Sequence, residues 1–151
     1  MSVQQGIFSA KLCEMDEQYE RFQARLMTCQ QMEHEAIRRE CGYMARECRE
    51  SEYILAQSMK GCRSRAVRRL ADIQLEYMKK ADDILENDMA EDMSDIADCA
   101  ERRAEASTLY AEFSMDFAVQ AMRHAMRAAL TAIDAQMDCD EKRSPQGGGN
   151  P

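Results

Sequence analysis

The stretch from Phe113 to Met137 constrains the fold more than any other, because as an α-helix it has almost no polar face. At about 100° per residue, its polar side chains fall on one narrow stripe, which consists of Asp116, Gln120, Arg123, Arg127, Thr131, Asp134 and Asp138. Alanines form one lane beside this stripe, and Met, Val, Leu and Ile form a second. A helix that is apolar over most of its circumference is buried by other helices on several sides. The sequence therefore predicts an all-α protein built around this helix.

The composition agrees with an all-α fold. The 151 residues are enough for one domain with a substantial core. No proline precedes Pro145, and good helix formers dominate while Val and Thr are scarce. We expect a single helical-bundle domain over residues 8–139, between a flexible lead of residues 1–7 and a disordered tail of residues 140–151.

Charge and cysteine content narrow the class of protein. The net charge of −8 argues against a general binder of nucleic acid or of anionic membranes. The seven cysteines are an odd number without a CxxC pair, and the N-terminus does not resemble a signal peptide. No apolar run approaches the length of about 18 residues that a membrane span needs. We therefore expect an acidic, methionine-rich cytoplasmic protein with reduced thiols.

A second apolar pattern lies near the N-terminus. It is a heptad seam with alternating steps of four and three, made of Phe8, Leu12, Met15, Tyr19, Phe22, Leu26 and Cys29. The seam weakens at Glu33 and resumes as far as Met59. The pattern allows one helix from Ser9 to Met59, with its weakest points at residues 30–33 and at Gly42.

The segment Lys60-Gly61-Cys62 predicts the first reversal of the chain. An antiparallel hairpin centred there pairs residues whose numbers sum to about 121. This register sets Leu55 against Ala66, Cys48 against Ile73, Met44 against Tyr77, Ile37 against Ile84, Arg38 and Arg39 against Asp82 and Asp83, and Glu52 against Arg69. Apolar and charged residues match in the same register, which favours an αα-hairpin.

A second hairpin follows the short helix predicted over residues 63–86. Asp88-x-x-Glu91 resembles a capping box, so the third helix is predicted to begin at Met89 and to run to Asp138. A hairpin centred before it sets Lys80 against Asp95 and Asp72 against Arg103.

The long, short, long order of these helices leaves apolar faces uncovered in an elongated three-helix bundle. Either the third helix turns back near Ser114 to make a four-helix body, or the overhangs pair with a second copy of the chain. The dimer is favoured, because the sequence around Ser114 contains no helix breaker. The predicted interaction residues are Phe8, Leu12, Met15, Tyr19, Phe22, Leu26, Phe117, Met122, Met126, Leu130 and Ile133.

Few residues suggest chemistry. The soft-ligand candidates for Cu(I) or Zn are Cys41, Met44, Cys48 and Cys62, although cysteine at a seam position usually acts as a small buried hydrophobe. Neither His34 nor His124 has the glutamate three residues before it that a di-iron bundle needs. We therefore expect no enzyme activity and no cofactor.

Two charged runs complete the pattern. The basic run has five basic residues and no acidic residue among them: Lys60, Arg63, Arg65, Arg68 and Arg69. An acidic run without a base includes Asp82, Asp83, Glu86, Asp88, Glu91, Asp92, Asp95 and Asp98. Such runs are usually solvated or neutralised within the fold, but the basic one could meet an acidic partner and the acidic one could mimic nucleic acid.

The pattern as a whole predicts a non-enzymatic interaction or assembly protein that self-associates through uncovered apolar seams, most simply as a homodimer. A further protein partner is compatible with it, a membrane is not expected, and nucleic acid is a poor fit to the charge. The alternatives are a Cys/Met-rich soft-metal or thiol-redox bundle and an acidic inhibitor that mimics nucleic acid.

Overall fold

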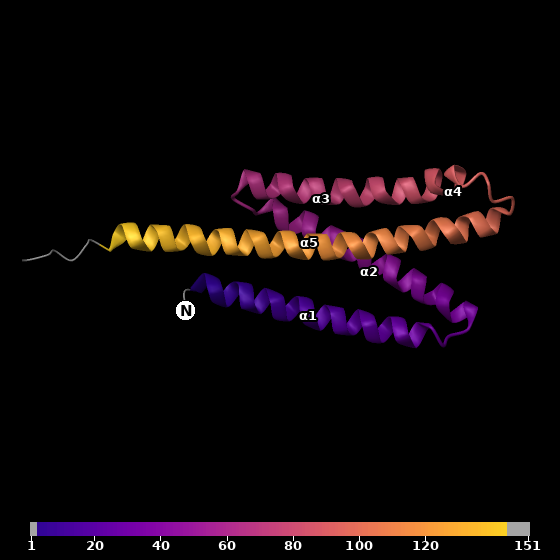
Figure 1. Ribbon diagram of the computed structural model, residues 1–151, viewed down its shortest axis with the longest axis horizontal. Helices are drawn as coiled ribbons and strands as arrows, with labels where there is room; N and C mark the ends of the chain where they lie inside the picture. The colour runs from indigo at the N-terminus through magenta and orange to yellow at the C-terminus, as the bar shows by residue number, and fades with distance from the viewer. Residues whose placement is uncertain (1–2, 145–151) are drawn as a thin grey trace, which may run out of the picture. The chain divides into compact units, whose positions relative to one another are not determined.

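The computed structural model describes residues 3–144, and these are helical apart from three short connections. The helices are α1 (Val3–Cys29), α2 (His34–Lys60), α3 (Arg65–Asp83), a π-helical turn η1 (Ile84–Asp88), α4 (Met89–Asp92) and α5 (Cys99–Arg143) (Figure 1). No strand occurs among these residues. The predicted all-α class is confirmed.

The chain divides into two compact units. The terminal unit joins the residues up to Leu26 with the residues from Phe113 onward. The central unit comprises Met27–Glu112. Because α5 is one continuous helix, it contributes its first part to the central unit and its second part to the terminal unit.

The first expected long helix is in fact two helices. α1 ends in a turn in which the Gln31 amide donates to the Thr28 carbonyl at 3.2 Å. α2 then starts after Glu33, whose extended backbone (φ −70°, ψ 156°) begins a new helix without a side-chain cap. The interruption coincides with the lapse of the heptad seam, whereas Gly42 lies within an uninterrupted helix.

The reversal predicted at Gly61 is confirmed. The Ser64 side chain caps α3 by accepting a hydrogen bond from the Val67 amide at 3.3 Å, which satisfies one of the free amides at the start of that helix. The two helices on either side of the reversal pack against each other in the central unit. The αα-hairpin is therefore present.

The predicted register of this hairpin agrees with the burial of Met44 and Tyr77, which it pairs and which are both half-buried, but not with the exposure of Ile73 and Ile84. Ile73 and Ile84, which it places inside, are both exposed, and the half-buried face of α3 carries Leu75 instead. Arg38, expected to face Asp82 or Asp83, pairs with Glu35 on its own helix at 2.8 Å. Pairs within a helix require no tertiary register, so they form wherever the spacing is three or four.

The predicted start of the third helix is wrong. Asp88 makes no capping hydrogen bond, because η1 carries the helical backbone past it into α4. The cap lies ten residues on, where the Asp98 carboxylate accepts from the amides of Ala100 at 2.8 Å and Glu101 at 2.9 Å. Asp98-x-x-Glu101 has the same spacing as the predicted box, so the sequence contained the signal twice.

The later start of α5 changes the second hairpin. The Tyr110 hydroxyl donates to the Asp82 carboxylate at 3.4 Å, a contact that centres this hairpin near residue 96. Lys80, predicted to face Asp95, pairs with Glu76 at 2.8 Å instead. The predicted second register is therefore wrong.

The helices extend beyond the predicted bounds of residues 8–139 at both ends. α1 already begins at Val3, so the lead is helical from that residue, and α5 extends into the predicted tail as far as Arg143. The rest of both segments, residues 1–2 and 145–151, lies outside the described residues. α5 does not turn back near Ser114.

Burial is sparse in the described part of the chain. Only Ala71 (5 % exposed) and Ala106 (2 % exposed) are buried, and both belong to the central unit. The helix through Phe113–Met137 forms as predicted, but the single chain does not bury it: Met122, Met126 and Leu130 all remain exposed. Its apolar circumference is thus available for contacts that one chain does not supply.

Candidate functional site

The heptad seam of α1 is the first candidate surface. Of its predicted interaction residues Phe8 is half-buried, whereas Leu12, Met15, Tyr19, Phe22 and Leu26 are exposed. Ion pairs flank the seam on the same helix, between Lys11 and Glu14 at 3.0 Å and between Arg21 and Glu17 at 3.8 Å. A helix with one apolar stripe and paired charges beside it is suited to packing against another helix.

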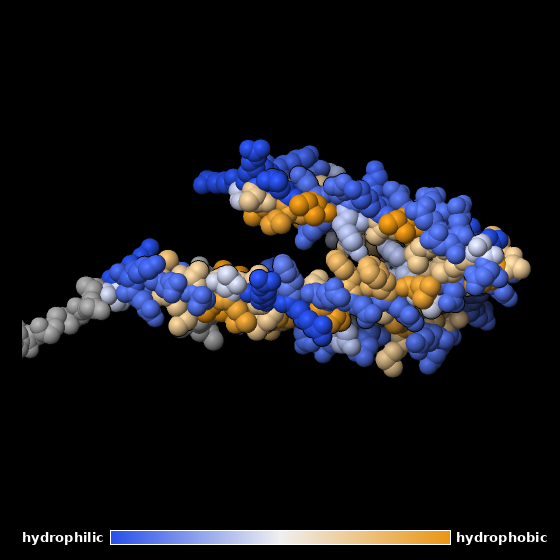
Figure 2. All heavy atoms as spheres, turned by 45° about the horizontal axis from the view of Figure 1, so that its top comes forward, coloured by the Kyte–Doolittle hydropathy of each residue, from blue (hydrophilic) through white to orange (hydrophobic). Residues whose placement is uncertain are grey.

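The second part of α5 carries the other candidate surface of the terminal unit. Ile133 is half-buried, and Phe117, Met122, Met126 and Leu130 are exposed. Phe113 and Phe117 stack one turn apart, with ring centroids 6.3 Å from each other. Figure 2 shows apolar side chains, in orange, gathered along this helix between charged ones. We define these two surfaces together as the terminal seams.

The cysteine and methionine candidates for a soft metal are not gathered into a site. Cys41 and Cys48 are exposed on α2, and Met44 between them is half-buried. The Cys62 thiol lies 3.7 Å from the Ser64 carbonyl oxygen in the reversal before α3. Across residues 3–144, no three His, Cys, Asp or Glu side chains are grouped so that they could hold a metal ion.

The basic run lies around the reversal between α2 and α3. The Arg68 guanidinium donates to the Cys62 carbonyl at 2.8 Å, a bond that ties the helix to the turn. Within the described chain, none of the five cations forms an ion pair, and Glu52 does not neutralise Arg69 as predicted. These charges face solvent.

The acidic run follows α3 through η1 and α4 to the start of α5. Asp82 accepts from Tyr110, and Asp98 caps α5. The other acids of the run, Asp83, Glu86, Asp88, Glu91, Asp92 and Asp95, have no ion pair with a described residue. Opposite charges therefore accumulate at the two ends of α3.

One ion pair on α3, between Glu76 and Lys80, shifts the pKa values of both residues. The hydrogen bond and charge of Lys80 lower the pKa of Glu76 below 4.5, and Glu76 raises the pKa of Lys80 above 10.5. Both groups are fully exposed, so salt screens the pair.

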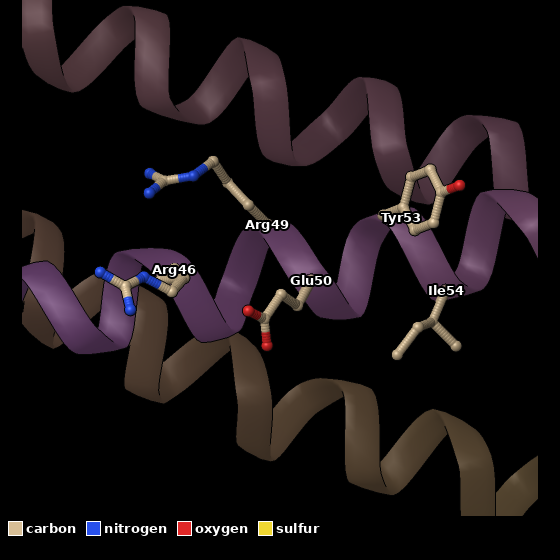
Figure 3. Close-up of a pocket in the computed structure, with 5 residues that line it drawn as sticks. All are labelled: Arg46, Arg49, Glu50, Tyr53 and Ile54. Atoms are coloured by element: carbon tan, nitrogen blue, oxygen red, sulfur yellow. The ribbon is translucent and has the colours of Figure 1, made fainter.

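A shallow hollow of about 420 Å³ lies on α2. Its lining residues, Arg46, Arg49, Glu50, Tyr53 and Ile54, all come from this one helix (Figure 3). None of these residues belongs to the predicted seams, although Tyr53 and Ile54 are large apolar groups that could have indicated an outward face. One helix alone encloses no reaction space, so the hollow offers a contact surface.

Comparison with known proteins identifies no relative of this chain. No protein-family model matches the chain, and neither the curated proteins nor the solved structures contain a match. None of the helices within residues 3–144 combines the length and the hydropathy needed to cross a membrane.

Proposed function

We propose that this protein is a non-enzymatic assembly protein that self-associates through the terminal seams. One observation carries the proposal: the two longest apolar patterns of the sequence, on α1 and on the second part of α5, remain exposed in the folded chain. Water-exposed apolar stripes of this length on a helix are stable only when another helix covers them.

The exposed area is of the size that a stable interface needs. The exposed side chains are Leu12, Met15, Tyr19, Phe22 and Leu26 on α1, and on α5 Met122, Met126 and Leu130, together with Met115, Val119 and Met137, which continue the same face of that helix. If each has roughly 80 Å² left to bury, two copies could bury roughly 1,800 Å² together, within the range of specific dimers. A second copy is the simplest partner, because it brings the same seams at equal concentration.

The proposal includes a specific arrangement of the helices of the two copies. The α1 seam of one copy packs on the second part of α5 of the other, and the two-fold axis repeats the contact. The result is a bundle of helices from both chains, elongated and antiparallel, in which α5 becomes the central helix that its sequence pattern predicts. The soft-metal and nucleic-acid-mimic alternatives remain predictions, and no grouping of the described residues favours either.

Sedimentation of the wild type and of Met126→Asp tests the proposal. At micromolar concentration the wild type should be a dimer or a larger oligomer. The variant places an unpaired carboxylate in the seam, which costs several kcal/mol when the seam is buried, so it should lose this interface and sediment as a smaller species than the wild type. Gln120→Asp adds the same charge on the polar stripe of this helix and should leave the assembly intact. A monomeric wild type, or equal effects of both substitutions, would refute the proposal.

A further inference from the structure

α3 carries a second apolar stripe that is largely exposed within the chain. Leu70 and Ile73 are 61 % and 60 % exposed, and Ile84 continues the stripe at 48 %. The buried Ala71 and the half-buried Leu75 of the same helix lie about 150° around the axis from this stripe. α3 therefore has one apolar face inside the central unit and another left in solvent.

The outer stripe follows a heptad. Its seam positions are Ala66, Leu70, Ile73, Tyr77, Lys80 and Ile84, at alternating steps of four and three. Tyr77 is half-buried and the others are exposed. Lys80 can cover an apolar neighbour with its aliphatic stem while the ammonium stays in water. This pattern is suited to a single partner helix.

The charges of α3 are opposite at its two ends. Arg65, Arg68 and Arg69 lie near the N-terminus, and Asp82 and Asp83 end the helix. In the described chain Arg69 and Asp83 have no ion-pair partner. Such a pattern repels a parallel copy of the same helix and attracts an antiparallel one, because reversal brings each basic end beside an acidic end.

We infer that a second copy of this chain packs its α3 antiparallel on this outer stripe, across a two-fold axis. Charge complementarity fixes the occupant and its orientation. Pairing seam residues whose numbers sum to about 150 sets Tyr77 against Ile73 of the second copy, Ile84 against Ala66, and Leu70 against the Lys80 stem. The same register sets Arg69 beside Asp83 of the second copy, twice per dimer.

The ion pair between Glu76 and Lys80 fits this arrangement. Near the two-fold axis the Glu76 carboxylates of the two copies come close together, and like charges across an interface disfavour binding. Lys80 lies 2.8 Å from Glu76 on the same helix and offsets that repulsion. The ion pair between Glu76 and Lys80, which forms in place of the predicted contact between Lys80 and Asp95, therefore reduces charge repulsion at the interface.

This interface goes beyond the proposed function, because it lies in the central unit and uses none of the terminal seams. A chain with two independent two-fold interfaces assembles beyond a dimer. Loss of either interface alone should leave dimers, and loss of both should leave monomers. The two proposals can therefore fail separately.

The test is charge reversal at the register pair, followed by sedimentation in low salt. Arg69→Glu should weaken the α3 contact about tenfold or more. Arg69→Glu with Asp83→Arg should restore it, since each pair is then reversed rather than broken. Lys79→Glu changes the net charge equally on the other side of α3 and should have no effect. Circular dichroism checks that each variant is folded.

A second variant addresses the apolar stripe. Ile73→Glu should abolish the α3 contact without loss of helix, because this side chain is exposed within the chain. A short DNA duplex serves as the competing polyanion. The inference is overturned if a folded Arg69→Glu protein assembles like the wild type, if the double reversal fails to restore assembly, or if Arg69→Glu affects only DNA binding.

Discussion

The central and the terminal unit use similar helices in different ways. The central unit contains the two buried residues of the described chain and the capped starts of α3 and α5. It also contains the hydrogen bond between Tyr110 and Asp82, which joins distant parts of the chain. The terminal unit has two long helices with most of their large apolar side chains in solvent. Small residues and caps thus define the fold of a single chain here, whereas large apolar stripes are left for association.

α5 makes this contrast within one helix. Ala106 is buried in the central unit, while Ala125 in the alanine lane of the terminal unit is exposed. Both residues have the same intrinsic helix propensity. Their difference in burial comes only from what lies beside them.

The largest expected effect comes from Ala106→Asp. A carboxylate buried without a partner should lower the free energy of unfolding by roughly 3 kcal/mol or more. Ala104→Asp on the exposed side of the same turn should change it by less than about 1 kcal/mol, mostly through the lower helix propensity of Asp. Urea denaturation followed by circular dichroism measures both. Equal losses would show that Ala106 is not in a packed contact, which would remove the contrast between the units.

An intermediate effect is expected from Gly42→Ala. An added Cβ at this helical glycine meets nothing within 4 Å, so α2 should gain about 0.5–1 kcal/mol. Hydrogen exchange by mass spectrometry should show slower exchange across α2 and α3 but not across α1. Gly6→Ala, which also has free space around the new Cβ, provides the reciprocal control in α1. Slower exchange throughout the chain in either variant would mean that the two units unfold together.

The smallest effect concerns the ion pair on α3. Because the pKa of Glu76 is lowered in the folded state, its contribution to stability is present above pH 4.5 and is lost as pH falls through the folded pKa. The raised pKa of Lys80 gives the opposite sense, with a contribution lost as pH rises above 10.5. Lys80→Met should return the pKa of Glu76 toward 4.5 in an NMR titration, and Lys11→Met should not. An unchanged pKa in the first variant would contradict the pairing.

The sequence by itself determined the helical class, the reversal at Gly61 and the continuity of α5 past Ser114. Each rests on a local property: periodicity over many residues, a glycine between two amphipathic stretches, or the absence of any breaker. These signals do not depend on what packs where, so they could be read without a structure.

The tertiary structure decided that the first long helix breaks at residues 30–33 and not at Gly42, and it decided the register of the second hairpin and the choice of Asp98 rather than Asp88 as a cap. Two identical Asp-x-x-Glu patterns cannot be ranked locally, since each is worth only about 1 kcal/mol. α3 carries heptad stripes on two faces, and which of them is buried depends on the helices that pack against it. Register is set by the sum of many weak contacts between distant residues, which a pattern along one chain does not contain.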